Sequence, residues 1–352
     1  MPERSFDAML ACPAPLDHRD IVELAHGGGG RKTARLIETL FAPAFRNPHL
    51  EPLGDGAVVT VGAERLAFTT DTFVVKPAFF PGGDIGSLAV HGTVNDLAMC
   101  GAEPLYLSAG YVLEEGFPMR DLARVVASMA AACRAVGVSL VTGDTKVVDR
   151  GKGDGIYVNT SGIGRVRPGV AVAPQKAAPG DAVLVSGPVG DHGIAVMAAR
   201  EGIDFETELL SDSAPVVAAV AALLAAVPDT HVLRDPTRGG LATALCEIAV
   251  SSNAGIRLDE AEIPVREEVR GACELLGFDP LYVACEGRFL AIVPGGKAEA
   301  ALAAIRSAPG GEAARRIGSV VADDPGRLVL KTRIGSHRLL ERLSGEQLPR
   351  IC

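Results

Sequence analysis

The segment DIGSLAVHGTVNDLAMCG (residues 84–101) carries apolar residues at helical spacing and is flanked by short apolar stretches. MRDLARVVASMAAACRAVG (residues 119–137) repeats the helical spacing. Strands are predicted by four segments: LAFTTDTFVV (66–75), PLYLSAGYVLEE (104–115), SLVTGDTKVV (139–148) and GIYVNTSGIGRV (155–166). Helices of roughly 10 to 18 residues among strands indicate an α/β or α+β fold.

A second domain is predicted after the Pro- and Gly-dense segment RVRPGVAVAPQKAAPGD, with the boundary near residues 166–180. Four strands are expected there: DAVLVSG (181–187), HVLRD (231–235), RFLAIVP (288–294) and VLKT (329–332). Four helices are expected between them, in two consecutive pairs: HGIAVMAAR (192–200), PVVAAVAALLAAV (215–227), LATALCEIAV (241–250) and VREEVRGACELLG (265–277).

The end of the chain is predicted to form a short helix and a free tail. IGSHRLLERL (residues 334–343) has the spacing of one short helix, and Gly345 and Pro349 prevent its continuation. We therefore expect four parts: a Gly-rich lid segment (1–42), an N-terminal domain (43–166), a C-terminal α+β domain (167–333), and a C-terminal helix with a mobile tail (334–352).

Composition and charge limit the classes of protein. The 352 residues are 48% hydrophobic, which is enough apolar surface for globular cores. The net charge of -9, without a basic run, argues against nucleic acid as a partner. No run of about 18 apolar residues exists to span a membrane. The N-terminus MPERSFDAML has charges where a secretory segment needs an apolar run, so we expect a cytoplasmic protein.

The seven cysteines have no zinc-binding spacing. Those in apolar, helix-like contexts are expected to act as small hydrophobes: Cys100, Cys133, Cys246 and Cys273. Cys352 differs because it closes the polar tail SGEQLPRIC, where an unused exposed thiol is a liability. Nine tail residues extend roughly 30 Å, so the thiol could reach a pocket on its own chain or on a neighbouring one.

Aspartates flanked by Gly, Thr or Asn recur at the expected ends of strands and helices. They are Asp55, Asp71, Asp96, Asp144 and Asp235. Any one of them has the pattern of ordinary turn or cap chemistry. Together they indicate a nucleotide site, because Mg²⁺ takes oxygen ligands and needs only one or two carboxylates besides phosphate oxygens.

Gly-rich stretches ahead of helices add a second indication of phosphate binding. HGGGG (residues 26–30) precedes an expected helix, whose free N–H groups favour an anion, so Gly28, Gly29 and Gly30 are candidate contacts. SGPVGDHG (186–193) and PTRGGL (236–241) have the same pattern. A Walker A motif is absent, because Arg31 rather than Gly precedes Lys32.

Motifs along nearly the whole chain carry a resemblance to a known family. They are VHGTVNDLAMCGAEPLYLSAGYVLEE, VTGDTKVV, SGPVGDHGIAVM, RDPTRGGLATALCEIA, EGRFLAIV and the closing PRIC. In this order they resemble the HypE family of hydrogenase-maturation carbamoyl dehydratases, within the wider group of phosphoribosyl-aminoimidazole synthetase and selenophosphate synthetase. The closing PRIC is particular to the HypE family.

The resemblance implies an aminoimidazole-synthetase-like fold of two domains. The N-terminal α/β domain would dimerise through its strands, and ATP would bind between it and a C-terminal α+β domain. A carbamoyltransferase, HypF, would load a carbamoyl group onto Cys352. ATP-dependent dehydration would then give a thiocyanate, whose cyanide passes to iron on the HypC–HypD complex for the nickel-iron hydrogenase.

This chemistry suggests a role for each candidate residue. Phosphorylation of the carbamoyl oxygen makes it a leaving group, and positioned Mg²⁺ ions neutralise charge during transfer. Asp55, Asp96 and Asp235 are the preferred metal ligands, with Asp71 and Asp144 as further nucleotide contacts. A base must then take the nitrogen protons.

Two residues are candidates for that base. They are Glu286 and Lys146, and the choice between them is open. The tail needs at least two positions: exposed for loading and delivery, and inserted for dehydration. Insertion into the tail's own chain or into a neighbouring one is also open.

Four further polar residues are weaker candidates. His91 and His192 are expected at pocket edges with structural or nucleotide contacts, and Asn95 and Asn159 could contact metal or phosphate.

Two alternative functions remain at this point. One is a small-molecule ATP-dependent synthetase or kinase of the same fold, in which the tail is incidental. The other is a non-catalytic module that binds a partner through its tail.

Overall fold

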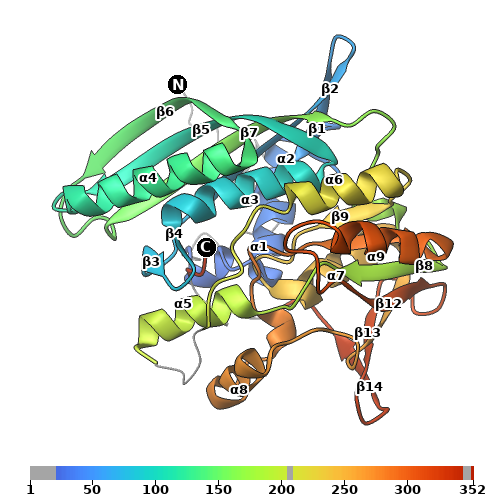
Figure 1. The fold of residues 1–352 in the computed structure, drawn as a ribbon. Helices are drawn as coiled ribbons and strands as arrows, with labels where there is room; N and C mark the ends of the chain where they lie inside the picture. Colours follow the sequence, from blue (N-terminus) through green and yellow to red (C-terminus); the bar gives the residue numbers. More distant parts are fainter. Residues whose placement is uncertain (1–20, 204–208, 344–349) are drawn as a thin grey trace, which may run out of the picture.

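The computed structural model describes residues 21–203, 209–343 and 350–352. It contains an N-terminal segment, two α/β domains and the last three residues of the chain, which return to the interior (Figure 1). Each domain consists of a sheet with its helices, and the two are called the first and the second layer. The N-terminal segment consists of short helical turns: η2 (Leu24–His26), α1 (Arg31–Leu36), the π-helical turn η3 (Ile37–Phe41) and α2 (Ala42–Ala44).

The first layer is a five-stranded sheet in the order β1-β2-β7-β5-β6, in which only β5 and β6 run parallel. Its strands are β1 (Ala57–Val61), β2 (Glu64–Phe73), β5 (Ala102–Glu114), β6 (Ser139–Val148) and β7 (Ile156–Val166). A small hairpin follows β2 in the chain, formed by β3 (Phe79–Phe80) and β4 (Gly83–Asp84).

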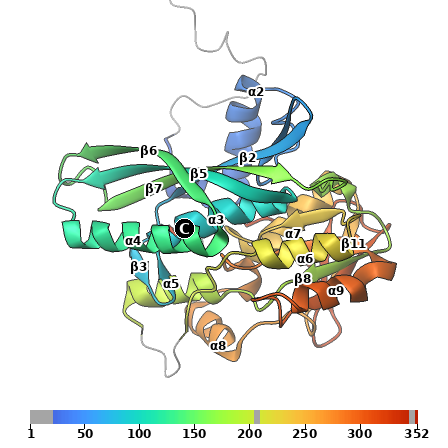
Figure 2. The same ribbon diagram turned by 45° about the horizontal axis from the view of Figure 1, so that its top comes forward.

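Two helices cover one face of this sheet (Figures 1 and 2). They are α3 (Ile85–Met99) and α4 (Met119–Val136). The carboxylate of Asp84 caps α3 by accepting hydrogen bonds from the backbone N–H groups of Gly86 and Ser87. Most of α3 is buried, because it lies between the sheet, α4 and the second domain.

The opposite face of the sheet carries exposed apolar side chains. Phe68, Ile163 and Tyr106 are register partners on β2, β7 and β5, and all three are exposed. Val112 lies further along β5 on the same face as Tyr106, and it is also exposed. Laterally paired residues share one face of a sheet, so these side chains form a single apolar surface.

The second layer is a seven-stranded mixed sheet in the order β14-β13-β10-β12-β8-β11-β9. Its strands are β8 (Asp181–Val185), β9 (Val232–Arg234), β10 (Gly255–Asp259), β11 (Leu290–Pro294), β12 (Arg315–Val321), β13 (Leu328–Lys331) and β14 (His337–Leu340). Its helices are α5 (Asp191–Glu201), α6 (Val217–Ala226), α7 (Gly240–Ser252), α8 (Glu267–Leu276) and α9 (Ala298–Arg306). Short helical turns complete it: η4 (Pro174–Lys176), η5 (Pro280–Tyr282) and η6 (Gly295–Lys297).

The core of the second layer lies on both faces of its sheet. Val183 and Val185 of β8 pack in one cluster with α7, whereas Ala182 and Leu184 pack in another with α6 and α9. This alternation is expected for a strand buried on both sides. Helices α5 and α8 form a separate cluster beside the sheet.

One predicted element is wrong. Residues 334–343 do not form a helix, because His337–Leu340 pair with β13 as the antiparallel strand β14. Gly335, at φ 84°, lies in the tight turn that brings the two strands together. Leu340 is buried in the core beside Leu328, its register partner. A short apolar pattern does not distinguish a strand from a helix. Here the hydrogen bonding to β13 makes this segment a strand.

Candidate functional site

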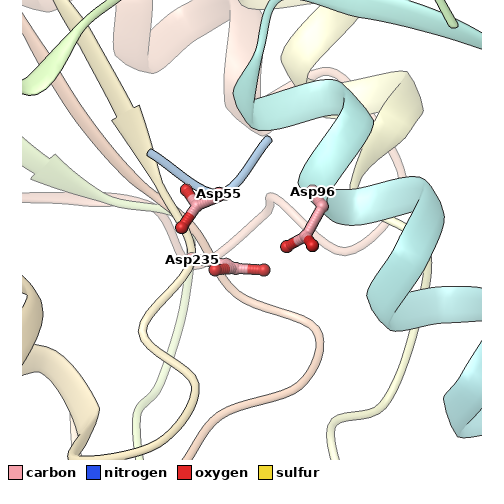
Figure 3. Close-up of side chains that lie close together, drawn as sticks. All are labelled: Asp55, Asp96 and Asp235. Atoms are coloured by element: carbon pink, nitrogen blue, oxygen red, sulfur yellow. The ribbon is translucent and has the colours of Figure 1, made fainter. Parts of the chain in front are cut away.

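Three carboxylates from distant parts of the chain meet between the two layers. One carboxylate oxygen from each of Asp55, Asp96 and Asp235 lies within 4.8 Å of the others. Figure 3 shows them pointing toward one another, with Asp96 on α3 and the other two on loops. Asp55 precedes β1, and Asp235 follows β9 directly. The cluster therefore exists only when both domains are folded against each other.

The electrostatics of this cluster favour a bound cation. Burial raises the pKa of Asp55 to about 6, and it raises the pKa values of Asp96 and Asp235 well above their ordinary range, with repulsion among the carboxylates adding to the effect. Thr69 donates a hydrogen bond of 2.7 Å to Asp96. Buried oxygen donors at this spacing match the ligands that Mg²⁺ prefers, so the residues fit the predicted metal.

Arg234 and Arg238 contribute positive charge on either side of the cluster. Arg234 forms ion pairs with Asp55 at 3.0 Å and with Glu247 at 2.8 Å. Arg238 lies 3.8 Å from the carboxylate of Asp71, whose pKa burial raises. The three aspartates of the cluster, the two arginines and their acidic partners line one cavity of about 580 Å³. Residues of the N-terminal segment form another part of its wall.

The last three residues of the chain are inserted beside this cavity. Backbone N–H groups of Val74 and Lys76 donate to the carbonyl oxygens of Cys352, at 3.0 Å, and of Arg350, at 3.2 Å. His192 contacts the carbonyl oxygen of Ile351 at 2.8 Å through Nε2. Ile351 is only 3% exposed and packs in the core of the first layer. The inserted position is thus held by backbone pairing and by apolar burial.

The Arg350 carbonyl and side chain make further contacts. Arg200 donates to the carbonyl oxygen of Arg350 at 2.7 Å. The guanidinium of Arg350 pairs with Asp154 and donates to the carbonyl of Val74 at 3.1 Å. These contacts add polar anchoring to the apolar burial of Ile351.

The insertion brings the thiol of Cys352 to the carboxyl group of Glu286. Burial raises the pKa of the thiol, Arg238 opposes that effect, and the nearby charges of Glu286 and Asp71 add to it. Glu286 is 3% exposed, and its Oε1 has no hydrogen-bond partner among the described residues. Burial and the nearby Asp71 and Asp235 raise its pKa well above the ordinary range. Such a carboxylate is a stronger base than an exposed one.

Comparison with known proteins places the chain in a family. Models of the AIR synthase related protein match it over both domains, the N-terminal one at residues 53–166 and the C-terminal one at 178–331. Carbamoyl dehydratase HypE of Azotobacter vinelandii is 55% identical over 331 residues, which cover 94% of this chain and 97% of that protein. The chain belongs to the HypE family of carbamoyl dehydratases.

Solved HypE structures share its fold. A HypE crystal structure in complex with ATP is 52% identical, with a TM-score of 0.80, and covers 94% of this chain and 100% of that one. The HypE of a HypE–HypF complex is 46% identical, with a TM-score of 0.83, and covers 88% and 99%. The predicted two-domain fold and the family resemblance are confirmed.

This HypE family member does not bring all the predicted residues together. Lys146 is exposed on β6 and pairs with Asp144 at 2.7 Å. Asp144 and Asn159 are register partners of Gly110 and face the open side of the first sheet, away from the helices. Neither these residues nor Lys146 line the two cavities within the described part of one chain. Their assignment stays a prediction.

The Gly-rich segment lies over the thiol. Gly27 and Gly28 line a small cavity of about 140 Å³ together with Cys352 and Arg238. Gly29 packs on Arg238, and Gly30 is the residue before α1. The predicted phosphate contact of these glycines stays a prediction, because their described contacts are with Arg238 and the tail pocket.

The histidines and Asn95 connect the site to one loop. His91 contacts the hydroxyl of Ser213 at 3.1 Å, and His192 contacts that of Ser211 at 2.8 Å. Asn95 donates to the carbonyl of Ala214 at 3.0 Å and to that of Glu286 at 3.3 Å. These are structural contacts, one of the two roles expected for the histidines.

The sequence prediction missed the arginines of the site. Arg234 and Arg238 flank Asp235 in RDPTRGGL. The sequence prediction interpreted only the aspartate of this stretch, as a metal ligand, and its glycines, as phosphate contacts. Two arginines beside a proposed ATP ligand were a usable signal, because Arg is the preferred partner of phosphate and carboxylate groups. Arg200 had no such signal, since it lies in an ordinary helical pattern.

Proposed function

We propose that this chain uses ATP to dehydrate a carbamoyl group carried on Cys352 to a cyano group. The observation that carries the proposal is the buried position of the Cys352 thiol near Glu286, whose side chain is only 3% exposed. Burial and the charge of Glu286 both raise the pKa of the thiol. The cavity that holds the three aspartates adjoins it through Arg238. This reaction requires a carrier thiol, a base and a cation site near one another.

The reaction has two steps, and ATP is a substrate of it. A lone pair of the carbamoyl oxygen forms a bond to the γ-phosphorus while the bond from that phosphorus to ADP breaks. Glu286 then takes one proton from the nitrogen. The second N–H proton leaves with the phosphate as the C–O bond breaks, and S–C≡N remains. The raised pKa of Glu286 supports its role as the base.

The chain's own residues position these groups. Asp55, Asp96 and Asp235 would hold Mg²⁺, which when bound neutralises phosphate charge during transfer. His192 and the backbone of Val74 hold the tail so that Cys352 faces Glu286. Ile351 closes the pocket from the core side, which keeps water from the carbamoyl group.

A homodimer that pairs through the open face of the first sheet is part of the proposal. That face carries the exposed apolar residues Phe68, Tyr106 and Ile163, together with Lys146 and Asp144. A second copy would cover this surface. Lys146 would then act in catalysis only from the partner copy, because it does not reach Cys352 within its own chain.

The chemistry of the substrates suggests the partners. The relative crystallised as a HypE–HypF complex supports a HypF-type carbamoyltransferase as the carbamoyl donor. A HypC–HypD complex would accept the cyanide. Both transfers need the thiol outside its pocket, because the described cavity around it holds only about 140 Å³.

Intact-mass spectrometry tests the function. After incubation with carbamoyl phosphate, ATP and the carbamoyltransferase, Cys352 should gain about 43 Da, falling to about 25 Da on dehydration. Glu286→Gln should retain the heavier adduct, and Cys352→Ser should form neither. Dehydration by Glu286→Gln at the wild-type rate would refute the assigned base, and adducts on Cys352→Ser would refute the carrier.

Size measurement tests the dimer. Tyr106→Glu places a charge on the open face, in one row with Phe68 and Ile163, and should convert a dimer to a monomer in light scattering. Ile334→Glu, at a side chain that is 91% exposed far from that face, is the matched control. A wild-type monomer at working concentration would contradict the proposed pairing.

A further inference from the structure

One side chain joins the two cavities of the site. The larger cavity contains the three aspartates, and the smaller one contains the thiol of Cys352. Among the described residues, Arg238 alone lines both. A phosphoryl group that passes from a nucleotide held at the aspartates to a group on the thiol must cross from the first cavity to the second, and it passes Arg238.

The guanidinium of Arg238 has hydrogen-bonding capacity to spare. Its described contacts are long, 3.5 Å to the carbonyl oxygen of Gly27 and 3.8 Å to the carboxylate of Asp71. Arg234 differs, because ion pairs of 3.0 and 2.8 Å engage it with Asp55 and Glu247. A guanidinium has five N–H donors in a planar fork that matches phosphate oxygens. Arg238 therefore lies between the two cavities and has N–H donors free to receive an anion.

The Gly-rich segment fixes the position of Arg238. Gly29 adopts φ 76°, and a Cβ atom built on it would lie 2.7 Å from Cβ and 3.0 Å from the carbonyl oxygen of Arg238. Only glycine fits this conformation and this close approach. The run of glycines thus lets the N-terminal segment lie directly against the backbone of Arg238.

We propose that Arg238 is a catalytic residue that binds the γ-phosphoryl group of ATP and stabilises it during transfer to the carbamoyl oxygen. The proposal rests on the proposed function. As the O–P bond to the carbamoyl oxygen forms and the bond to ADP breaks, negative charge develops on oxygens on both sides of the phosphorus. Fixed guanidinium donors stabilise this charge more than they stabilise the bound substrates.

Nucleotide binding gives a test that does not depend on turnover. Arg238→Gln should weaken binding of a non-hydrolysable ATP analogue about tenfold or more, since a charged hydrogen bond to the γ-phosphoryl is lost, and leave ADP binding within about twofold. Calorimetry with Mg²⁺ measures both affinities. Arg257→Gln is the matched control: this arginine on β10 is 47% exposed and forms an ion pair with Asp323, away from the cavity.

The ratio of the affinity for the ATP analogue to the affinity for ADP decides the proposal. An unchanged ratio in Arg238→Gln overturns it, whatever the rate of dehydration. Gly29→Ala is the second variant, and it should shift the ratio in the same direction because it displaces Arg238 without replacing any charged residue. Thermal melts confirm that each variant is folded.

Mass spectrometry of the complete reaction separates this proposal from the proposed function. Arg238→Gln should accumulate the carbamoyl adduct with dehydration slowed about 100-fold. If wild-type protein forms no cyano adduct, the proposed function fails. If the wild type and Arg238→Gln form it equally fast, only the role of Arg238 fails.

Discussion

Ile351→Ala should release the tail from its pocket. Ile351 is 3% exposed in the core of the first layer, and the substitution removes three buried carbon atoms next to Cys352. At about 0.8 kcal/mol for each buried carbon, the inserted position loses roughly 2 kcal/mol. That corresponds to about a thirtyfold larger population with the thiol exposed. The backbone hydrogen bonds to residues 350–352 are unaffected by the change, so the effect is on docking alone.

Alkylation of Cys352 by iodoacetamide measures that population. Burial raises the pKa of the inserted thiol, so it reacts slowly and the exposed thiol determines the rate. Peptide mass spectrometry should show about thirtyfold faster alkylation of Cys352 in Ile351→Ala, with Ile334→Ala as an exposed control. Asp154→Asn breaks the partly exposed ion pairs of Asp154 with Arg350 and Lys76 and should give less than about fivefold. Equal rates in wild type and Ile351→Ala, or a larger effect of Asp154→Asn, would refute this account of docking.

Two further predictions concern buried carboxylates. Burial and the nearby Asp212 raise the pKa of Asp191 to about 6. The folded state therefore binds more protons than the unfolded state between about pH 4 and 6. The free energy of unfolding falls as the pH rises through that window. Asp191→Asn should increase the free energy of unfolding at pH 8 by about 1 to 3 kcal/mol, with no gain at pH 4, and urea unfolding at both pH values checks this. Asp96→Asn removes repulsion from Asp55 and Asp235, so it should raise the melting temperature without ligand and abolish the further rise on adding Mg²⁺ and ATP. A lower melting temperature without ligand would contradict the repulsion.

Periodicity was sufficient for the elements with long apolar patterns. The helix predicted at 84–101 is α3, and the strands predicted at 66–75 and 104–115 are β2 and β5. The strands β10 and β12 were not predicted, because GIRLD and RRIGSVV are short and place exposed arginines among apolar residues. Such segments become strands through their neighbours in the sheet, which local sequence does not show.

The candidate site shows where local sequence loses information. Asp71 in TTDT and Asp144 in TGDT have nearly the same neighbours, and both were predicted to contact nucleotide. Asp71 is paired with Thr160, whose side chain is buried on the helix side, whereas Asp144 is one row further along and lies on the open side. A shift of one residue moves a side chain to the other face of a sheet. Register, which depends on long-range pairing, therefore decides which aspartate reaches the cavity.

The tail illustrates how docking strength would suit the proposed carrier role of Cys352. In the proposed reaction Cys352 faces Glu286 for dehydration, yet its pocket has no room for another protein to reach the thiol. The buried side chain of Ile351, the ion pair of Arg350 with Asp154, and a few hydrogen bonds that water can replace hold the inserted position. Docking of a few kcal/mol leaves a small population of molecules with the tail exposed, which a partner can bind. A partner shifts the equilibrium between the inserted and the exposed tail only by as much as it prefers the exposed tail. A more apolar anchor than Ile351 would slow loading, and a weaker one would leave the carbamoyl group away from its base.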